Sequence, residues 1–139
     1  MDGKLTRATE VERVSELLGL PEEINDTDSL IAQVTTGLPT KSVEKILEVM
    51  NSQPVLNLIP ERAFRRAKAA KIPLSPDRSQ VLYDFARAYV AADKIHSGNG
   101  ALVMRFLEKP NPDLGGAAPM ALAISSPAGA DAVIELLSR

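Results

Sequence analysis

The segment from Phe106 to Pro119 constrains this chain most, because it concentrates residues that interrupt a helix. It reads Phe-Leu-Glu-Lys-Pro-Asn-Pro-Asp-Leu-Gly-Gly-Ala-Ala-Pro. Pro110 and Pro112 lack a backbone donor and push the residue before them out of the α region. The two glycines permit a positive φ or a close backbone approach, and the last proline suits the start of another helix. The spacing predicts a stiff, shaped loop between two helices, although a helix–helix turn with no further role fits it as well.

The rest of the chain shows apolar residues at spacings of three and four, interrupted by proline and glycine. We therefore expect helices over residues 10–20, 26–36, 41–51, 54–58, 60–71 and 76–96, then one ending at Lys109, a short one from Pro119 and a last one from Pro127. Asp26 or Thr27 and Thr40 are the expected caps of two of them. Residues expected to face inward include Leu30, Ile31, Val34, Leu82, Phe85, Tyr89, Ile95, Leu102, Val103 and Leu107. Only Val55–Ile59 resembles a strand, so the predicted fold class is an all-α helical bundle.

Composition excludes several classes of protein. The 139 residues are 45% hydrophobic and 24% charged, as in ordinary folded chains. The length fits one domain or two small ones, and we divide the chain into residues 1–74 and 75–139. Without cysteine there is no disulfide framework and no thiolate metal site. With neither a signal-peptide core nor an apolar run of the ~18 residues that a membrane helix needs, we expect a cytoplasmic protein with no membrane partner.

Charge is distributed unevenly along the chain, although the net charge is only −2. Residues 10–28 hold seven acids and one base, whereas residues 61–78 hold six bases and two acids. A local basic patch on an acidic chain indicates an anionic partner at one place.

The basic residues gather on one predicted helix, 60–71. At about 100° per residue, its arginines fall on one face, and Phe64 and Ala67 fall on the other. Helices 41–51, 54–58 and 60–71 together resemble a helix-turn-helix in which 60–71 is the recognition helix. Arginine reads guanine and lysine binds phosphate in such motifs, although a solvated arginine face that contacts nothing fits the same pattern. The candidate DNA-binding residues are Arg62, Arg65, Arg66, Lys68 and Lys71.

The loop and the residues that follow it resemble the C-terminal toxin-binding domain of the Xre/MbcA/ParS antitoxins, over roughly residues 60 to 139. Where relatives commonly have Trp before Leu and Arg-Thr after the two glycines, this chain has Phe106 and Ala117-Ala118. The residues that carry the resemblance are Phe106, Leu107, Pro110, Asn111, Pro112, Leu114, Gly115, Gly116, Pro119, Gly129 and Ala130.

The resemblance implies an antitoxin that pairs with a RES-domain toxin, an enzyme that degrades NAD⁺. Such antitoxins block the toxin's active site with their C-terminal residues and commonly repress their own operon. The implied partners are a cognate RES-domain toxin and operator DNA. We also expect a homodimer, because DNA readers of this kind usually match two half-sites and helix 76–96 exposes enough length for a partner's surface. A frayed helix end fits the C-terminal residues as well. The implied toxin-binding residues are Asn111, Leu114, Gly115 and Gly116 in the loop, and Leu136, Leu137, Ser138 and Arg139 in the tail.

Two other functions stay open. One is a helix-turn-helix transcriptional regulator without a toxin partner, which a small-molecule pocket between the C-terminal helices would favour. The other is an antitoxin whose helix-turn-helix no longer binds DNA. Catalysis has no positive sign, because His96 is the only histidine and Gly115-Gly116 is not followed by the Lys-Ser or Lys-Thr of a phosphate loop. We therefore expect no enzyme activity, no catalytic residues, no metal and no cofactor.

Overall fold

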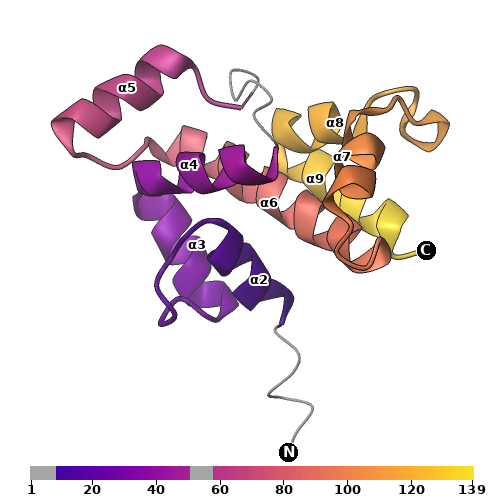
Figure 1. The fold of residues 1–139 in the computed structure, drawn as a ribbon, viewed down its shortest axis with the longest axis horizontal. Coiled ribbons are helices and arrows are strands. Elements are labelled where there is room, and N and C mark those ends of the chain that lie inside the picture. Colours follow the sequence, from indigo (N-terminus) through magenta and orange to yellow (C-terminus); the bar gives the residue numbers. More distant parts are fainter. Residues whose placement is uncertain (1–8, 51–57) are drawn as a thin grey trace, which may run out of the picture.

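The computed structural model describes residues 9–50 and 58–139, and these residues fold into helices without a strand (Figure 1). The predicted all-α class is confirmed. The predicted helix 54–58 lies outside the described residues except for Leu58, which is in a turn. The elements are α2 (Glu10–Leu17), α3 (Thr27–Thr36), α4 (Thr40–Val49), α5 (Glu61–Ala70), α6 (Pro76–Ile95), α7 (Gly100–Glu108), the 3-10 turn η2 (Pro112–Leu114), α8 (Pro119–Ser125) and α9 (Pro127–Leu137).

Side-chain caps set several helix starts. Asp26 caps α3 by accepting a hydrogen bond from the backbone N–H of Ser29 at 2.9 Å. The hydroxyl of Ser29, followed by its backbone N–H, lowers the pKa of Asp26 by stabilising the carboxylate. Ser75 caps α6 and places Pro76 in the first helical turn. The prediction that Thr40 caps α4 is wrong, because Thr40 is the first residue inside that helix.

Helix α6 is the centre of the molecule. It packs against α2, α3 and α4 from the first half of the chain and against α7, α8 and α9 from the second (Figure 1). Its side chains Leu82 and Phe85 are fully buried, and so are the alanines at positions 86, 88 and 92. The small alanines let neighbouring helices approach from several directions. A helix that is apolar over most of its circumference belongs inside a fold.

This central position corrects one expectation about the homodimer. Only Pro76, Asp77, Lys94 and Ile95 of α6 are exposed, so the helix does not offer length for a partner's surface. Its middle is covered by the chain itself.

Three of the residues expected to face inward are exposed. Ile31, Ile95 and Leu102 keep 46%, 55% and 40% of their surface in solvent. Each lies at the edge of an apolar stripe or near a helix end, where no neighbouring helix covers it. Leu30, Val34, Leu82, Phe85, Val103 and Leu107 are buried as predicted, and Tyr89 nearly so.

Two loops are joined side by side at Gly37. The N–H of Leu74 donates to the carbonyl of Leu38 at 2.8 Å, and the N–H of Leu38 donates to the buried hydroxyl of Ser79 at 2.7 Å. Gly37 has a φ of +124°, and a Cβ there would lie 2.4 Å from the carbonyl oxygen of Leu74. The loop before α4 is thus fixed to the loop before α6. Because the loop before α6 follows directly on α5, this connection also anchors the C-terminal end of α5.

Candidate functional site

Asn111 organises the loop between α7 and α8. Its backbone N–H donates to Ala117, and its carbonyl accepts from the N–H groups of Leu114 and Gly116, all at 3.0 Å. Its side-chain oxygen accepts from the N–H of Asp113 at 2.9 Å. The flanking prolines supply no competing N–H groups. The loop is therefore closed by hydrogen bonds to one residue, as the predicted stiff loop requires.

The two glycines of the loop are needed for their backbone conformation. Gly115 has a φ of +69° and Gly116 a φ of +89°, and a Cβ on either would meet no atom within 4 Å. Of the two explanations the sequence allowed, positive φ is therefore correct and close approach is not. Leu114 is half-buried against the core, and its turn η2 packs on α9.

Replacing Asn111 with alanine should destabilise the protein by about 1 kcal/mol, because the N–H of Asp113 loses its acceptor. The measurement is the free energy of unfolding in urea, with amide exchange at Asp113 as a local readout. Asn111→Asp keeps an acceptor oxygen and should stay within a few tenths of a kcal/mol of the native protein. Equal losses in the two variants would contradict this role of the side chain.

Helices α8 and α9 meet at a junction with no room for a side chain. Ser126 caps α9 by accepting from the N–H of Gly129 at 3.0 Å. A Cβ on Gly129 would lie 2.0 Å from the carbonyl oxygen of Leu122 and 3.2 Å from the hydroxyl of Ser125. Glycine at this position lets the first turn of α9 rest directly on the backbone of α8.

A buried ion pair within α6 extends to α9 through an exposed carboxylate. Asp84 of α6 is 1% exposed, and its Oδ1 lies 2.8 Å from Nη2 of Arg87 and 3.0 Å from Nε2 of Gln80. Nη1 of Arg87 donates to Asp131 of α9 at 2.7 Å. Burial alone lowers the pKa of Arg87, but the hydrogen bonds to the two carboxylates outweigh it and raise that pKa above its ordinary value.

The C-terminal tail is partly packed and partly free. Leu136 and Leu137 form the last turn of α9 and are half-buried, with Leu137 packed against the core. Ser138 and Arg139 are exposed, and Arg139 approaches Glu135 at 3.8 Å. Loop and tail lie at the same end of the long axis of the molecule, and α5 lies at the other end (Figure 1).

Helix α5 presents the expected arginine face. Arg62, Arg65 and Arg66 are all exposed, whereas Ala67 is buried and Phe64 is half-buried. Nη2 of Arg65 donates to Glu61 one turn earlier at 3.2 Å. Within residues 9–50 and 58–139, no ion pair engages Arg62 or Arg66.

The two lysines of the candidate DNA-binding set differ in their surroundings. Nζ of Lys68 lies 2.6 Å from Oε2 of Glu44 on α4 and 5.7 Å from the ring centre of Phe64. Lys71 is exposed and ends α5 in the left-handed conformation, with a φ of +58°. The structure therefore distinguishes Lys68 from the other four residues by its surface ion pair with another helix, in which the Lys68 side chain stays 58% exposed.

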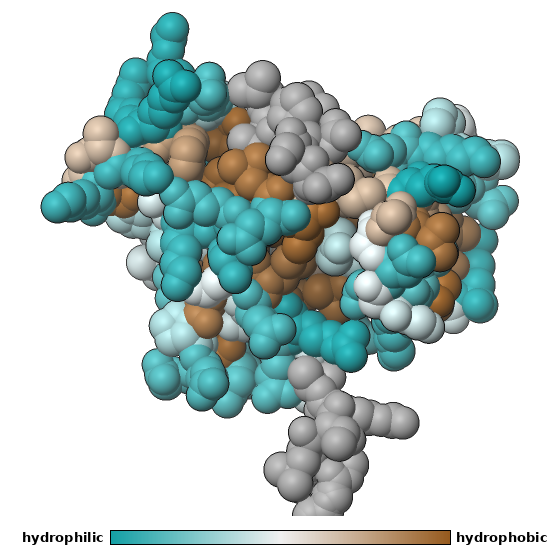
Figure 2. All heavy atoms as spheres, viewed as in Figure 1, coloured by the Kyte–Doolittle hydropathy of each residue, from teal (hydrophilic) through white to brown (hydrophobic). Residues whose placement is uncertain are grey.

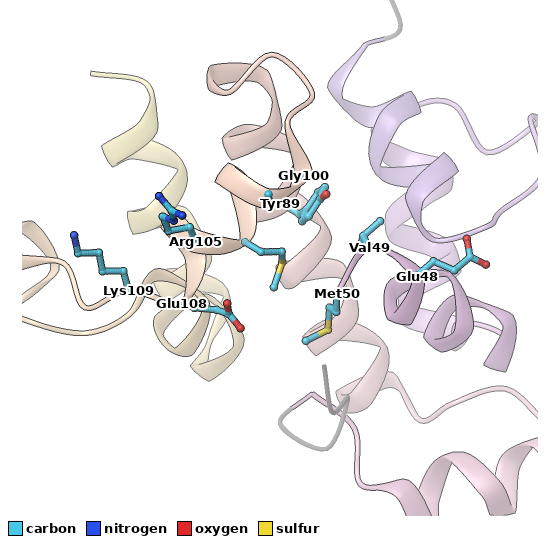
Figure 3. A pocket seen from close by; sticks show the side chains of 10 residues that line it. Glu48, Val49, Met50, Tyr89, Gly100, Arg105, Glu108 and Lys109 are labelled. Carbon is cyan, nitrogen blue, oxygen red and sulfur yellow. The ribbon is translucent and has the colours of Figure 1, made fainter. Parts of the chain in front are cut away.

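An open hollow of about 780 Å³ lies between α4, α6 and α7 (Figure 3). Val49, Met50 and Tyr89 face it, whereas Glu48, Arg105 and Lys109 point outward. In Figure 2, brown apolar surface is visible between the two halves of the molecule. Burial and the negative charge of Asp93 raise the pKa of Tyr89. The regulator alternative called for a pocket between C-terminal helices, and this hollow instead borders α4.

Sequence reasoning missed the Asp84–Arg87–Asp131 network and the pairing of Lys68 with Glu44. An acid and an arginine three residues apart within a mostly apolar helix pattern were the available signal for the first. The described part of the chain contains no cluster of three potential metal ligands. None of its helices is long and apolar enough to cross a membrane.

Part of the chain matches a known protein family. No curated protein matches the chain. Residues 91–139 match the family model described as the antitoxin Xre/MbcA/ParS C-terminal toxin-binding domain. The match begins in the last residues of α6 and includes all eight candidate loop and tail residues, but it is shorter than the predicted resemblance and excludes α5. Residues 91–139 are therefore a C-terminal toxin-binding domain of the Xre/MbcA/ParS antitoxin family.

Proposed function

We propose that this chain neutralises a RES-type, NAD⁺-degrading toxin by placing its C-terminal residues in the toxin's active site. We further propose that it binds operator DNA through α5 and represses its own operon, acting in the cytoplasm. The observation that carries the first part is the end of α9, a firmly packed helix that terminates in exposed residues within the matched domain.

Several contacts support the tail as the inserted segment. Helix α9 is fixed by the close approach of Gly129 to α8, by the Arg87–Asp131 ion pair and by the packing of η2. Beyond these anchors, the helix is followed by Ser138 and Arg139, which are exposed. A rigid helix with an exposed cationic side chain near its end suits a pocket that accepts a phosphate-bearing dinucleotide, because little conformational entropy is lost on insertion.

Deleting Ser138 and Arg139 should weaken neutralisation while leaving the fold intact. The deletion removes two exposed residues, their hydrogen bonds to the last turn of α9 and one exposed ion pair, so the free energy of unfolding should change by only about 1 kcal/mol. The measurement is growth and cellular NAD⁺ during co-expression with the toxin encoded beside this gene. A variant with alanine at both positions keeps the chain length and separates the effect of length from that of side-chain chemistry. Full protection by the shortened protein would refute tail insertion.

The accessible arginines of α5 support DNA binding. Arg62 and Arg66 point away from the packed face with no ion pair in the described part of the chain, so a nucleic acid can approach them without displacing an internal partner. Arginine forms bidentate hydrogen bonds with guanine in the major groove. The small Ala69 on the same face leaves space for close approach.

Replacing Arg62, Arg65 and Arg66 with alanine should lower affinity for the DNA upstream of the gene on the order of tenfold or more. The dependence of affinity on salt should also become shallower, because fewer phosphates are neutralised. Fluorescence anisotropy at several salt concentrations measures both. Arg105→Ala, an exposed arginine on α7, is the matched control and should have no effect. An unchanged affinity in the triple variant would leave an antitoxin without this DNA-binding function.

We also propose a homodimer, because readers of two half-sites usually pair. Its surface lies outside the middle of α6. If the neighbouring gene product proves neither toxic nor bound by this chain, the alternative of a transcriptional regulator without a toxin replaces the first part of the proposal.

A further inference from the structure

Few contacts hold helix α5 in place. It packs against α4, and of its residues only Ala67 is buried. Phe64 adds a half-buried ring next to it. Within residues 9–50 and 58–139, the ion pair between Lys68 and Glu44 is the single side-chain hydrogen bond from α5 to another helix. The loop before α6 anchors the C-terminal end of α5, and the packing of the helix itself on α4 depends on Phe64, Ala67 and Lys68.

Lys68 lies at the edge of this packing face by its position on the helix. At about 100° per residue, it lies about 40° from Phe64, about 60° from Arg65 and about 160° from Arg66. Its ammonium group lies 2.6 Å from the carboxylate of Glu44 and 5.7 Å from the centre of the Phe64 ring. Both contacts lie at the surface, with the Lys68 side chain 58% exposed, and the nearby carboxylate offsets the positive charge that the ammonium group would offer to a DNA phosphate.

We infer that Lys68 and Glu44 form a positioning pair, which fixes the angle of α5 on α4 and so aims the arginine face, and that Lys68 is not a phosphate ligand. The consequence for DNA binding rests on the function proposed above. The pairing itself rests only on the contacts between the two helices.

A double-mutant cycle on DNA affinity distinguishes a positioning role of Lys68 from a phosphate-binding role. The two roles predict opposite changes in affinity for Glu44→Ala. For a positioning pair, Glu44→Ala and Lys68→Ala each lower affinity roughly two- to fivefold, the range of an exposed ion pair. The double variant then binds no more weakly than either single variant, and the salt dependence stays as in the native protein. For a phosphate ligand, Glu44→Ala frees the ammonium group and tightens binding, and Lys68→Ala makes the salt dependence shallower. That second pattern, or no effect of Glu44→Ala, overturns the inference.

Two matched variants calibrate the cycle. Glu48 lies one turn beyond Glu44 on the same helix and approaches Lys45 instead of α5, so Glu48→Ala should leave affinity unchanged. Arg66→Ala should lower both affinity and salt dependence, as expected for a residue that contacts DNA.

Amide hydrogen exchange tests the pair without DNA. In Glu44→Ala and Lys68→Ala, the amides of α5 should exchange several-fold faster, whereas those of α6 should keep their native rates, because only the attachment of α5 is weakened. Native exchange rates in α5 would overturn the inference by themselves. If the native protein binds no DNA, the proposed DNA function fails, and the exchange experiment still decides whether the pair positions α5.

Discussion

Gly129→Ala should be one of the most damaging single substitutions in this protein, with an expected loss of about 3 kcal/mol in the free energy of unfolding. The new Cβ would lie 2.0 Å from the carbonyl oxygen of Leu122 and 2.9 Å from its carbonyl carbon. These are backbone atoms of α8, so no side-chain rotation relieves the overlap, and α9 must move away from α8. Urea unfolding measures the loss, and binding to the toxin should fall with it because the tail is displaced.

Gly100→Ala is the matched control for this substitution. Gly100 begins α7, and a Cβ there would meet the hydroxyl oxygen of Tyr89 at 3.5 Å, an ordinary contact. Alanine is favoured over glycine in helices, so this variant should be as stable as the native protein or slightly more so. If both variants unfold at the same urea midpoint as the native protein, the backbones of α8 and α9 are not in the described contact.

Arg87→Met should cost about 3 kcal/mol, for an electrostatic reason. The substitution keeps an unbranched apolar side chain on α6 but removes the charge that faces Asp84, whose side chain is 2% exposed. The carboxylate is then buried with only the amide of Gln80 as a partner, at 3.0 Å. The expected result is a lower urea midpoint with an unchanged slope of the transition.

Two further variants show whether the buried carboxylate is the cause. Asp131→Asn removes the negative charge of the second partner of Arg87. The side chain of Asp131 is 69% exposed, so the change should cost less than about 1 kcal/mol. Adding Asp84→Asn to Arg87→Met removes the uncompensated charge and should recover part of the lost stability. A double variant that is less stable than Arg87→Met would show that lost packing, and not the unpaired charge, explains the effect.

Local patterns determined a large part of this fold. The all-α class and most helix bounds follow from apolar spacing and from caps such as Asp26 and Ser75. The stiff loop at Asn111 follows from its prolines and glycines, because each restricts its own backbone. The exposure of the α5 arginines follows from the period of one helix. The toxin-binding family of the C-terminal domain was also evident from this loop, because its motif is contiguous in the sequence.

Only the tertiary structure decided how these helices cover one another. It buried the middle of α6, left Ile95 and Leu102 exposed, and paired Asp84 with Arg87 and Asp131. It also placed Gly129 directly against the backbone of α8 and paired Lys68 with Glu44. Each of these facts depends on which surface of one helix meets a segment distant in sequence. The period of a helix shows which residues share a face, but the partner of that face is fixed by packing of the whole chain.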